Sequence, residues 1–213
     1  MTETDIANYA LAYLGEPKIS SIDDTNSKAA RTCKQFMAPT IAEILRSHRW
    51  NCAIKRATLT RLTETPNHHY SYFYALPTGF LRLLELNGEP HNDSDEFFEL
   101  ENNKLATDSD TAEIRYIKNI ETSDFDPLLT KAVALSLAST VAVPLTSKIE
   151  LQSQCFTLFE RAIGKARQID AIEVGTREGR PMERFMSQSR LIQSRFLSST
   201  GLPHCFFKRF TNL

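Results

Sequence analysis

The sequence predicts an α+β protein: a four-helix bundle with a small antiparallel β-domain inserted between helices 2 and 3, plus a C-terminal arm. Two patterns predict this fold. Apolar residues recur at spacings of three and four near the beginning of the chain and again after residue 126, as on amphipathic helices. Between them lie short apolar runs separated by turn formers, which are typical of antiparallel strands. The bundle is expected at 1–49 and 124–175, the β-domain at 50–123 and the arm at 176–213.

The first two helices are predicted at about 4–14 and 27–49. Gly15 ends the first helix, because glycine adopts the left-handed conformation that follows a last helical turn. Pro39 lies inside the apolar pattern of the second helix. Since proline lacks an N–H and clashes with the preceding turn, we expect a kink or an interruption there.

Six short strands are predicted between Trp50 and the third helix. They are the apolar runs at 53–62, 70–75, 80–86, 97–100, 104–107 and 113–117. Asn87-Gly88 and Asn102-Asn103 are the best candidates for hairpin turns, because both residue types accept a positive φ. The spacing of runs and turns predicts a β-meander or a small barrel.

Two further helices are predicted at about 128–143 and 147–174. Asp126 can cap the first of them, and Pro127 suits the first helical position. This helix is apolar nearly all round, so it is expected to be the most buried one. Pro144 is expected to end it.

Composition excludes several classes of protein. With 41% hydrophobic and 24% charged residues, the chain can bury a core as ordinary globular proteins do. No run of about 18 apolar residues occurs, so no membrane-spanning segment is predicted. The acidic, amphipathic beginning is not expected to be a signal peptide. The four cysteines are far apart, which favours reduced thiols in a cytosolic product.

The charge is unevenly distributed. Residues 176–213 carry seven Lys/Arg and two Glu, a net charge of +5, so the rest of the chain holds −6 of the total of −1. A basic arm on an acidic body is typical of a segment that docks on a partner. The candidate interface residues are Arg184, Arg190, Arg195, Phe196, Phe206, Phe207 and Phe210. The alternative is that the arm packs on its own bundle.

Motifs of catalysis are missing from the sequence. It contains no glycine-rich nucleotide loop, no nucleophile elbow and no H-E-x-x-H zinc motif, so we predict no catalytic, cofactor-binding or metal residues. His68-His69 is expected in a loop, because adjacent strand residues face opposite sides. The acidic run is expected at a solvated strand edge, since it lacks the glycine and the spacing of a calcium loop. Its members are Asp93, Asp95, Glu96, Glu99 and Glu101.

The stretch SHRWNCAIKRATL holds Trp50, the only tryptophan of the chain, among several basic residues. An aromatic ring beside cations can stack on single-stranded nucleic acid. The spacing favours another role, because Trp50 continues the apolar stripe that includes Ile41 and Leu45. We therefore predict a structural junction: Trp50 is a buried anchor where the second helix passes into the first strand.

Five segments in order resemble one family. They are YALAYLGEPKISSIDD, APTIAEILRSHRWNCAIKRATL, YALPTGFLRLLELNG, AEIRYIKNIETSDFDPLLTKAVALSLASTVAVPLT and ARQIDA, which corresponds to the end of the last bundle helix. Together they are similar to the L-G-E, W-N-x-A, Y-x-L-P and F-D-P-L elements of the tail tubular protein A-like head-to-tail adaptors of short-tailed bacteriophages and prophages. The resemblance covers about residues 5–175. Gly79 stands where the family usually has Asp, and the arm matches no pattern of the family.

The resemblance implies a structural virion protein at the head-tail junction, present in the host cytoplasm during assembly. It implies a ring of generally twelve copies that docks on the portal protein, extends the DNA channel and carries the tail nozzle and the fibres. DNA would pass through without specific binding, and neither a membrane nor a cofactor is implied. The family has no catalytic residues, so the chain is expected not to be an enzyme. In this setting the arm would insert at a subunit or portal interface.

The sequence leaves a second function open, that of a nucleic-acid-binding accessory protein. It would use the basic arm together with the segment from Arg46 to Arg61. Steep salt dependence of DNA binding would distinguish it from the adaptor.

Overall fold

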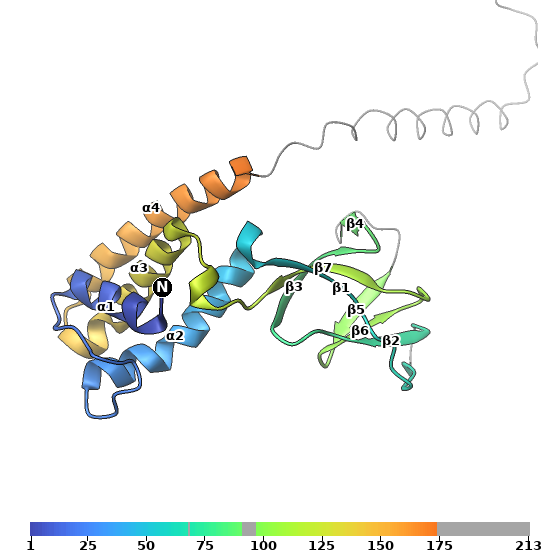
Figure 1. Ribbon diagram of the computed structural model, residues 1–213, viewed down its shortest axis with the longest axis horizontal. Coiled ribbons are helices and arrows are strands. Elements are labelled where there is room, and N and C mark those ends of the chain that lie inside the picture. The colour runs from blue at the N-terminus through green and yellow to red at the C-terminus, as the bar shows by residue number, and fades with distance from the viewer. Residues whose placement is uncertain (68, 91–96, 174–213) are drawn as a thin grey trace, which may run out of the picture. The chain divides into compact units, whose positions relative to one another are not determined.

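The computed structural model describes residues 1–67, 69–90 and 97–173 (Figure 1). These residues form four α-helices and two small antiparallel sheets, which confirms the predicted α+β class. The helices are α1 (Glu3–Leu14), α2 (Lys28–Ser47), α3 (Pro127–Thr146) and α4 (Ile149–Glu173). The strands are β1 (Ile54–Thr58), β2 (Tyr72–Ala75), β3 (Phe80–Leu86), β4 (Glu89–Pro90), β5 (Phe98–Glu101), β6 (Lys104–Thr107) and β7 (Glu113–Lys118).

Local signals fix the beginnings and ends of the helices. Thr2 and Asp5 form a reciprocal capping box at the start of α1, and this contact lowers the pKa of the Asp5 carboxyl. Gly15 ends α1 with a φ of 70°, as predicted. At α3, the Asp126 carboxylate accepts hydrogen bonds from the N–H groups of Leu128 and Leu129, and Pro127 occupies the first turn. The predicted capping of α3 is confirmed.

Neither proline interrupts its helix, so the expectation that Pro144 ends α3 was wrong. Helix α2 runs through Pro39 without interruption, and α3 continues past Pro144 to Thr146. Both prolines are exposed, so water can solvate the carbonyl that loses its helical donor. Buried residues on both sides of Pro39 hold α2 together, and α3 ends instead at Ser147, whose N–H donates to the carbonyl of Val143.

Helix α3 is the centre of the larger hydrophobic core. It contacts each of the other three helices, and no residue from Ala132 to Ala142 is exposed. Among the described helices, α3 alone is long and apolar enough to cross a membrane, but 56% of that stretch is buried, as in a core helix. Among the described residues helix α4 is packed on one side, where Cys155, Ile163 and Ala166 are buried.

The chain segment that follows β1 forms hydrogen bonds with both sheets. The strand orders are β1-β7-β3-β4 and β2-β6-β5. After β1, the N–H of Leu59 still donates to Ala112 beside β7, while the carbonyl of Thr60 and the N–H of Leu62 bond to β2. The predicted strand 53–62 is therefore split, with its first half in one sheet and its last residues against the other. Both sheets enclose a second core around Tyr74, Leu86 and Leu105.

Both predicted hairpin turns are confirmed. Asn87 and Gly88 connect β3 to β4 with φ angles of 49° and 85°. Asn102 and Asn103 connect β5 to β6 with φ angles of 44° and 61°. Positive φ at both central positions is the geometry that matches the twist of the flanking strands.

The burial of α3 sets a first expectation about stability. Replacing Leu137, which is fully buried, with alanine should lower the free energy of unfolding by about 2–5 kcal/mol, because the side chain leaves a cavity. Chemical denaturation followed by far-UV circular dichroism measures the change. Ile149→Ala is the matched control, since that side chain is 72% exposed and its loss should cost under about 0.5 kcal/mol. Equal costs for the two variants would contradict the assignment of the core.

Candidate functional site at the junction of α2 and α4

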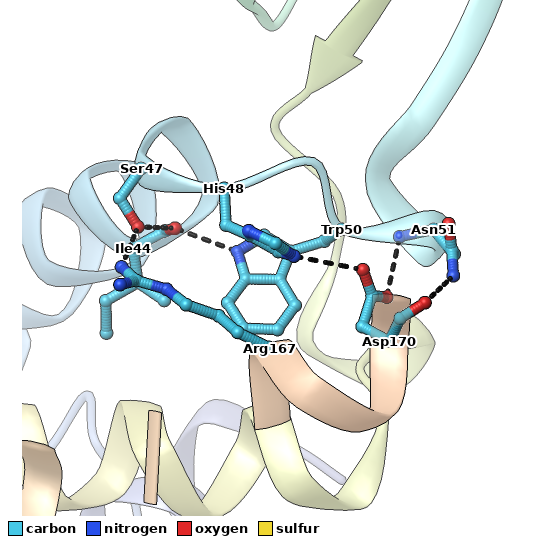
Figure 2. Close-up of polar contacts among 7 residues, drawn as sticks. All are labelled: Ile44, Ser47, His48, Trp50, Asn51, Arg167 and Asp170. Atoms are coloured by element: carbon cyan, nitrogen blue, oxygen red, sulfur yellow. Dashed lines mark hydrogen bonds and ion pairs between the residues drawn. The ribbon is translucent and has the colours of Figure 1, made fainter. Parts of the chain in front are cut away.

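Trp50 lies at the end of α2, where the chain turns toward β1. Its side chain is 2% exposed, and its indole Nε1 donates a hydrogen bond of 2.9 Å to the carbonyl of Ile44 (Figure 2). The His48 ring packs edge-on against it, with 4.7 Å between ring centroids. The bond to Ile44 satisfies one of the carbonyls that the end of α2 leaves without a helical donor. Trp50 is thus both the hydrophobic anchor and the polar cap of this end.

Asp170 joins the last turns of α4 to this segment. Its carboxylate accepts a hydrogen bond of 2.9 Å from the N–H of Asn51 and lies 3.2 Å from Nε2 of His48. The side chain of Asn51 donates in return to the carbonyl of Asp170, at 2.8 Å. Figure 2 shows His48 and Asn51 both directed at Asp170. Two elements more than 100 residues apart in sequence are therefore held by three polar contacts.

One turn earlier in α4, Arg167 makes a fourth contact. Its guanidinium donates to the hydroxyl of Ser47 at 3.1 Å, and that hydroxyl donates to the carbonyl of Ile44 at 2.8 Å. The carbonyl of Ile44 consequently accepts from both Ser47 and Trp50 (Figure 2). The end of α2 is fixed by side chains of its own segment and of α4.

A pocket of about 270 Å³ opens beside this junction. Its lining residues are Trp50, Asn51, Cys52, Asp124, Phe125, Asp126, Ala166, Ile169, Asp170 and Glu173. Two of its carboxylates already have structural roles, because Asp126 caps α3 and Asp170 binds Asn51. The remaining polar groups hold neither a paired acid and base nor an activated nucleophile.

The cysteine in the pocket is a poor nucleophile. Burial raises the pKa of the Cys52 thiol above its ordinary value, so the thiol rather than the thiolate predominates near neutral pH. Burial likewise raises the pKa of Cys33 to about 11 and raises that of Cys155. These three cysteines are free thiols.

The structure places the predicted residues as follows. Trp50 is buried, so its ring presents no face on which a base could stack. Arg46 donates to the carbonyl of Leu81 at 2.6 Å, and Arg61 lies over the ring of Tyr72, so both have structural partners. The predicted arm interface (Arg184, Arg190, Arg195, Phe196, Phe206, Phe207 and Phe210) lies outside the described residues, as do His68, Asp93, Asp95 and Glu96.

The family resemblance includes Asn51 in W-N-x-A and Asp170 in ARQIDA, but sequence reasoning assigned neither residue a role. Their contact could not be predicted, because the two residues lie far apart in the chain. Within residues 1–67, 69–90 and 97–173, no group of three or more His, Cys, Asp or Glu side chains could hold a metal ion. No protein-family model matches this chain, and a search of curated proteins finds no match.

Removing the Asp170 carboxylate tests the junction. Asp170→Ala leaves the part-buried N–H of Asn51 without its acceptor, which should lower the free energy of unfolding by about 1–3 kcal/mol. Because Trp50 is the only tryptophan, its fluorescence reports on the junction directly, and its emission should shift to longer wavelength in the variant.

Glu160→Ala is the control, because Glu160 is exposed on the same helix. It should leave both the emission and the free energy of unfolding unchanged. An Asp170→Ala protein with the stability and emission of the unmodified chain would show that α4 is held by its apolar contacts alone.

Proposed function

We propose that this chain is a structural virion protein that forms the head-to-tail adaptor ring of a short-tailed bacteriophage or prophage. In this proposal the ring docks on the portal, extends the DNA channel and carries the tail nozzle and the fibres. Copies of the chain are made in the host cytoplasm and end at the head-tail junction of the virion. The protein acts through its surfaces and carries out no reaction.

The proposal rests on the ordered series of motifs that resembles the adaptor family. Residues of these motifs occupy positions that begin or end an element. Gly15 ends α1, Trp50 closes the end of α2, and Asp126 with Pro127 starts α3. A chain that carries these residues in the same order is expected to fold in the same way. The adaptor function itself comes from the resemblance, because a fold alone does not determine a function.

The finer architecture belongs to the same proposal. The four helices, at 1–49 and 124–175, would form a bundle, and the β-domain at 50–123 would be an insert between α2 and α3. Such a protein offers two kinds of surface, one on the bundle and one on the insert. Each subunit of a ring between a portal and a nozzle needs contacts with the neighbouring subunits of the same ring and with the portal and the nozzle.

The exposed side of α4 supports an assembly role. Five large apolar residues on this helix are exposed by 39–72%: Ile149, Phe156, Leu158, Ile169 and Ile172. At 100° per residue, Ile149 and Phe156 lie on one flank, and Leu158, Ile169 and Ile172 lie on the opposite flank. A cyclic ring uses two different surfaces of each subunit, one for each neighbour. Two separate apolar flanks fit that requirement.

The arm at 176–213 is proposed as a further contact with the portal or with a neighbouring subunit. Its net charge of +5 would suit an acidic partner surface, and its aromatic end would add apolar contact. If it instead binds DNA, the alternative function gains support.

Mixing the purified protein with the portal protein of the same genome tests the proposal. Sedimentation velocity should show a faster complex that contains both proteins, because an adaptor ring adds to the portal. A portal protein from an unrelated phage is the control and should not bind. Absence of a complex with the intact cognate portal at micromolar concentrations would contradict the adaptor function.

DNA binding across a range of salt concentrations tests the alternative. An adaptor should bind DNA weakly and without sequence preference. Tight binding that falls steeply with salt, and that is lost in Arg184→Glu/Arg190→Glu/Arg195→Glu, would favour the nucleic-acid-binding function. Lys18→Glu/Lys148→Glu/Lys165→Glu has the same change of charge on exposed residues elsewhere and is the matched control.

A further inference from the structure

Strand β5 is the last strand of its sheet. In the order β2-β6-β5, its only neighbour among the described strands is β6. The two-residue turn at Asn102-Asn103 makes Glu101 and Lys104 a hydrogen-bonded pair, and such pairs alternate along an antiparallel ladder. The N–H and C=O of Leu100 therefore point away from β6. The Leu100 side chain is 44% exposed although its sheet partner Leu105 is fully buried, so the second core is open at this edge.

The side chains along this edge are acidic on one face. Glu99 and Glu101 are exposed and share the face opposite to Leu100. Lys104, which stands across from Glu101, is already bound to Glu64 at 2.5 Å. No described side chain therefore neutralises Glu99 or Glu101.

Strand β1 is also an edge strand, and its exposed charged side chains are basic. It is the edge of the other sheet, with β7 as its neighbour there. The N–H of Leu59 donates to the carbonyl of Ala112, which continues the register of the β1–β7 pairing. Backbone groups along a strand point alternately toward and away from its neighbour, so those of Leu59 point toward β7 and those of Arg56 point away from it. Lys55 and Arg56 are exposed, and neither has an ion-pair partner among the described residues.

We infer that β1 of one copy of the chain pairs antiparallel with β5 of a second copy, through an interface of basic strand against acidic strand. The alternation allows only registers in which even-numbered residues of the two strands face each other, because the outward backbone groups belong to those residues. Among these registers, the one that pairs the opposite charges of Lys55 and Glu101 places Arg56 opposite Leu100. Glu99 then lies diagonally from Lys55, within reach of its long side chain. The stem of Arg56 covers the exposed Leu100.

This contact is heterologous, because each copy uses β1 to bind one neighbour and β5 to bind the other. It rests on the proposed function in one respect: in the adaptor ring it would be the contact between neighbouring subunits, in addition to α4. Exposed strand edges are otherwise a route to uncontrolled aggregation, and opposite charges on the two edges give the pairing a defined partner. The contact is small, so the free chain should associate only weakly.

Disulfide trapping detects a weak contact and reports its register. In the inferred ladder Lys55 and Glu101 form a non-hydrogen-bonded pair, whose Cβ atoms are about 4.5 Å apart, close enough for a disulfide. Lys55→Cys and Glu101→Cys are made separately in a full-length Cys205→Ser background. Mixed under oxidised glutathione, they should give a cross-linked dimer that neither gives alone. Lys55→Cys mixed with Glu160→Cys is the matched control and should give none.

Two further variants separate this contact from other causes. Leu100→Pro removes an N–H that points away from β6, so it should abolish the cross-link while Trp50 emission stays unchanged. Arg184→Glu/Arg190→Glu/Arg195→Glu should leave the cross-link intact, and its loss would assign the acidic edge to the arm and overturn the inference. A cross-link through Glu99→Cys in place of Glu101→Cys would keep the contact with the register moved by two residues.

No cross-link with either glutamate position would overturn the inference. The cross-linking result and the portal-binding result can fail separately. A cross-link without portal binding would leave the strand contact in place and contradict the adaptor function. The variants Lys55→Glu and Glu99→Lys/Glu101→Lys should bind the portal more weakly than the unmodified chain does. Equal binding would contradict the strand contact and leave the adaptor function in place. Glu43→Lys/Glu160→Lys is the control for the change of charge.

Discussion

The structure depends on the burial of α3. Over the eleven residues from Ala132 to Ala142 no side chain of this helix is exposed, and only Ser136 and Thr140 are partly buried, so other elements must cover most of its surface. Helices α1, α2 and α4 do so. Because α2 and α3 are separated in sequence by the seven strands, the chain must leave the helices after α2 and return to them at the start of α3. That requirement determines where the β-strands are attached.

The chain leaves the helices at the junction around Trp50 and returns to them close to it. Strand β1 leaves it and pairs with β7, which leads back to α3, so the outgoing and returning segments support one another. Asp170 holds the far end of α4 against the same segment, and Arg46 binds the carbonyl of Leu81 at the start of β3. Leu84 and Ile117 of the sheet belong to the helical core, which makes the connection hydrophobic as well as polar. The surfaces that remain are those proposed for assembly: the flanks of α4 and the two strand edges.

Sequence reasoning found most elements because their signals are local. The caps at Asp126 and Gly15 and the turns at Asn87 and Asn102 depend on a few neighbouring residues, so they could be predicted. The effect of the prolines could not be predicted. The free-energy cost of a proline inside a helix depends on whether water solvates the carbonyl that loses its hydrogen-bond donor. The bend after β1 and the contacts of Asp170 depend on residues far away in the chain, and no local pattern encodes them. The sequence predicted the acidic run at a solvated strand edge, but only the topology shows that the basic strand β1 is the edge of the other sheet.

Amide hydrogen exchange, compared between the free chain and the chain bound to its cognate portal, is the most direct test of function through assembly. If copies of this chain form a ring, exchange should slow at β1, at β5 and along the exposed flanks of α4, while α3 stays protected in both states. A bound chain whose protection changes only at the pocket beside Trp50, with both strand edges exchanging as fast as in the free protein, would contradict it.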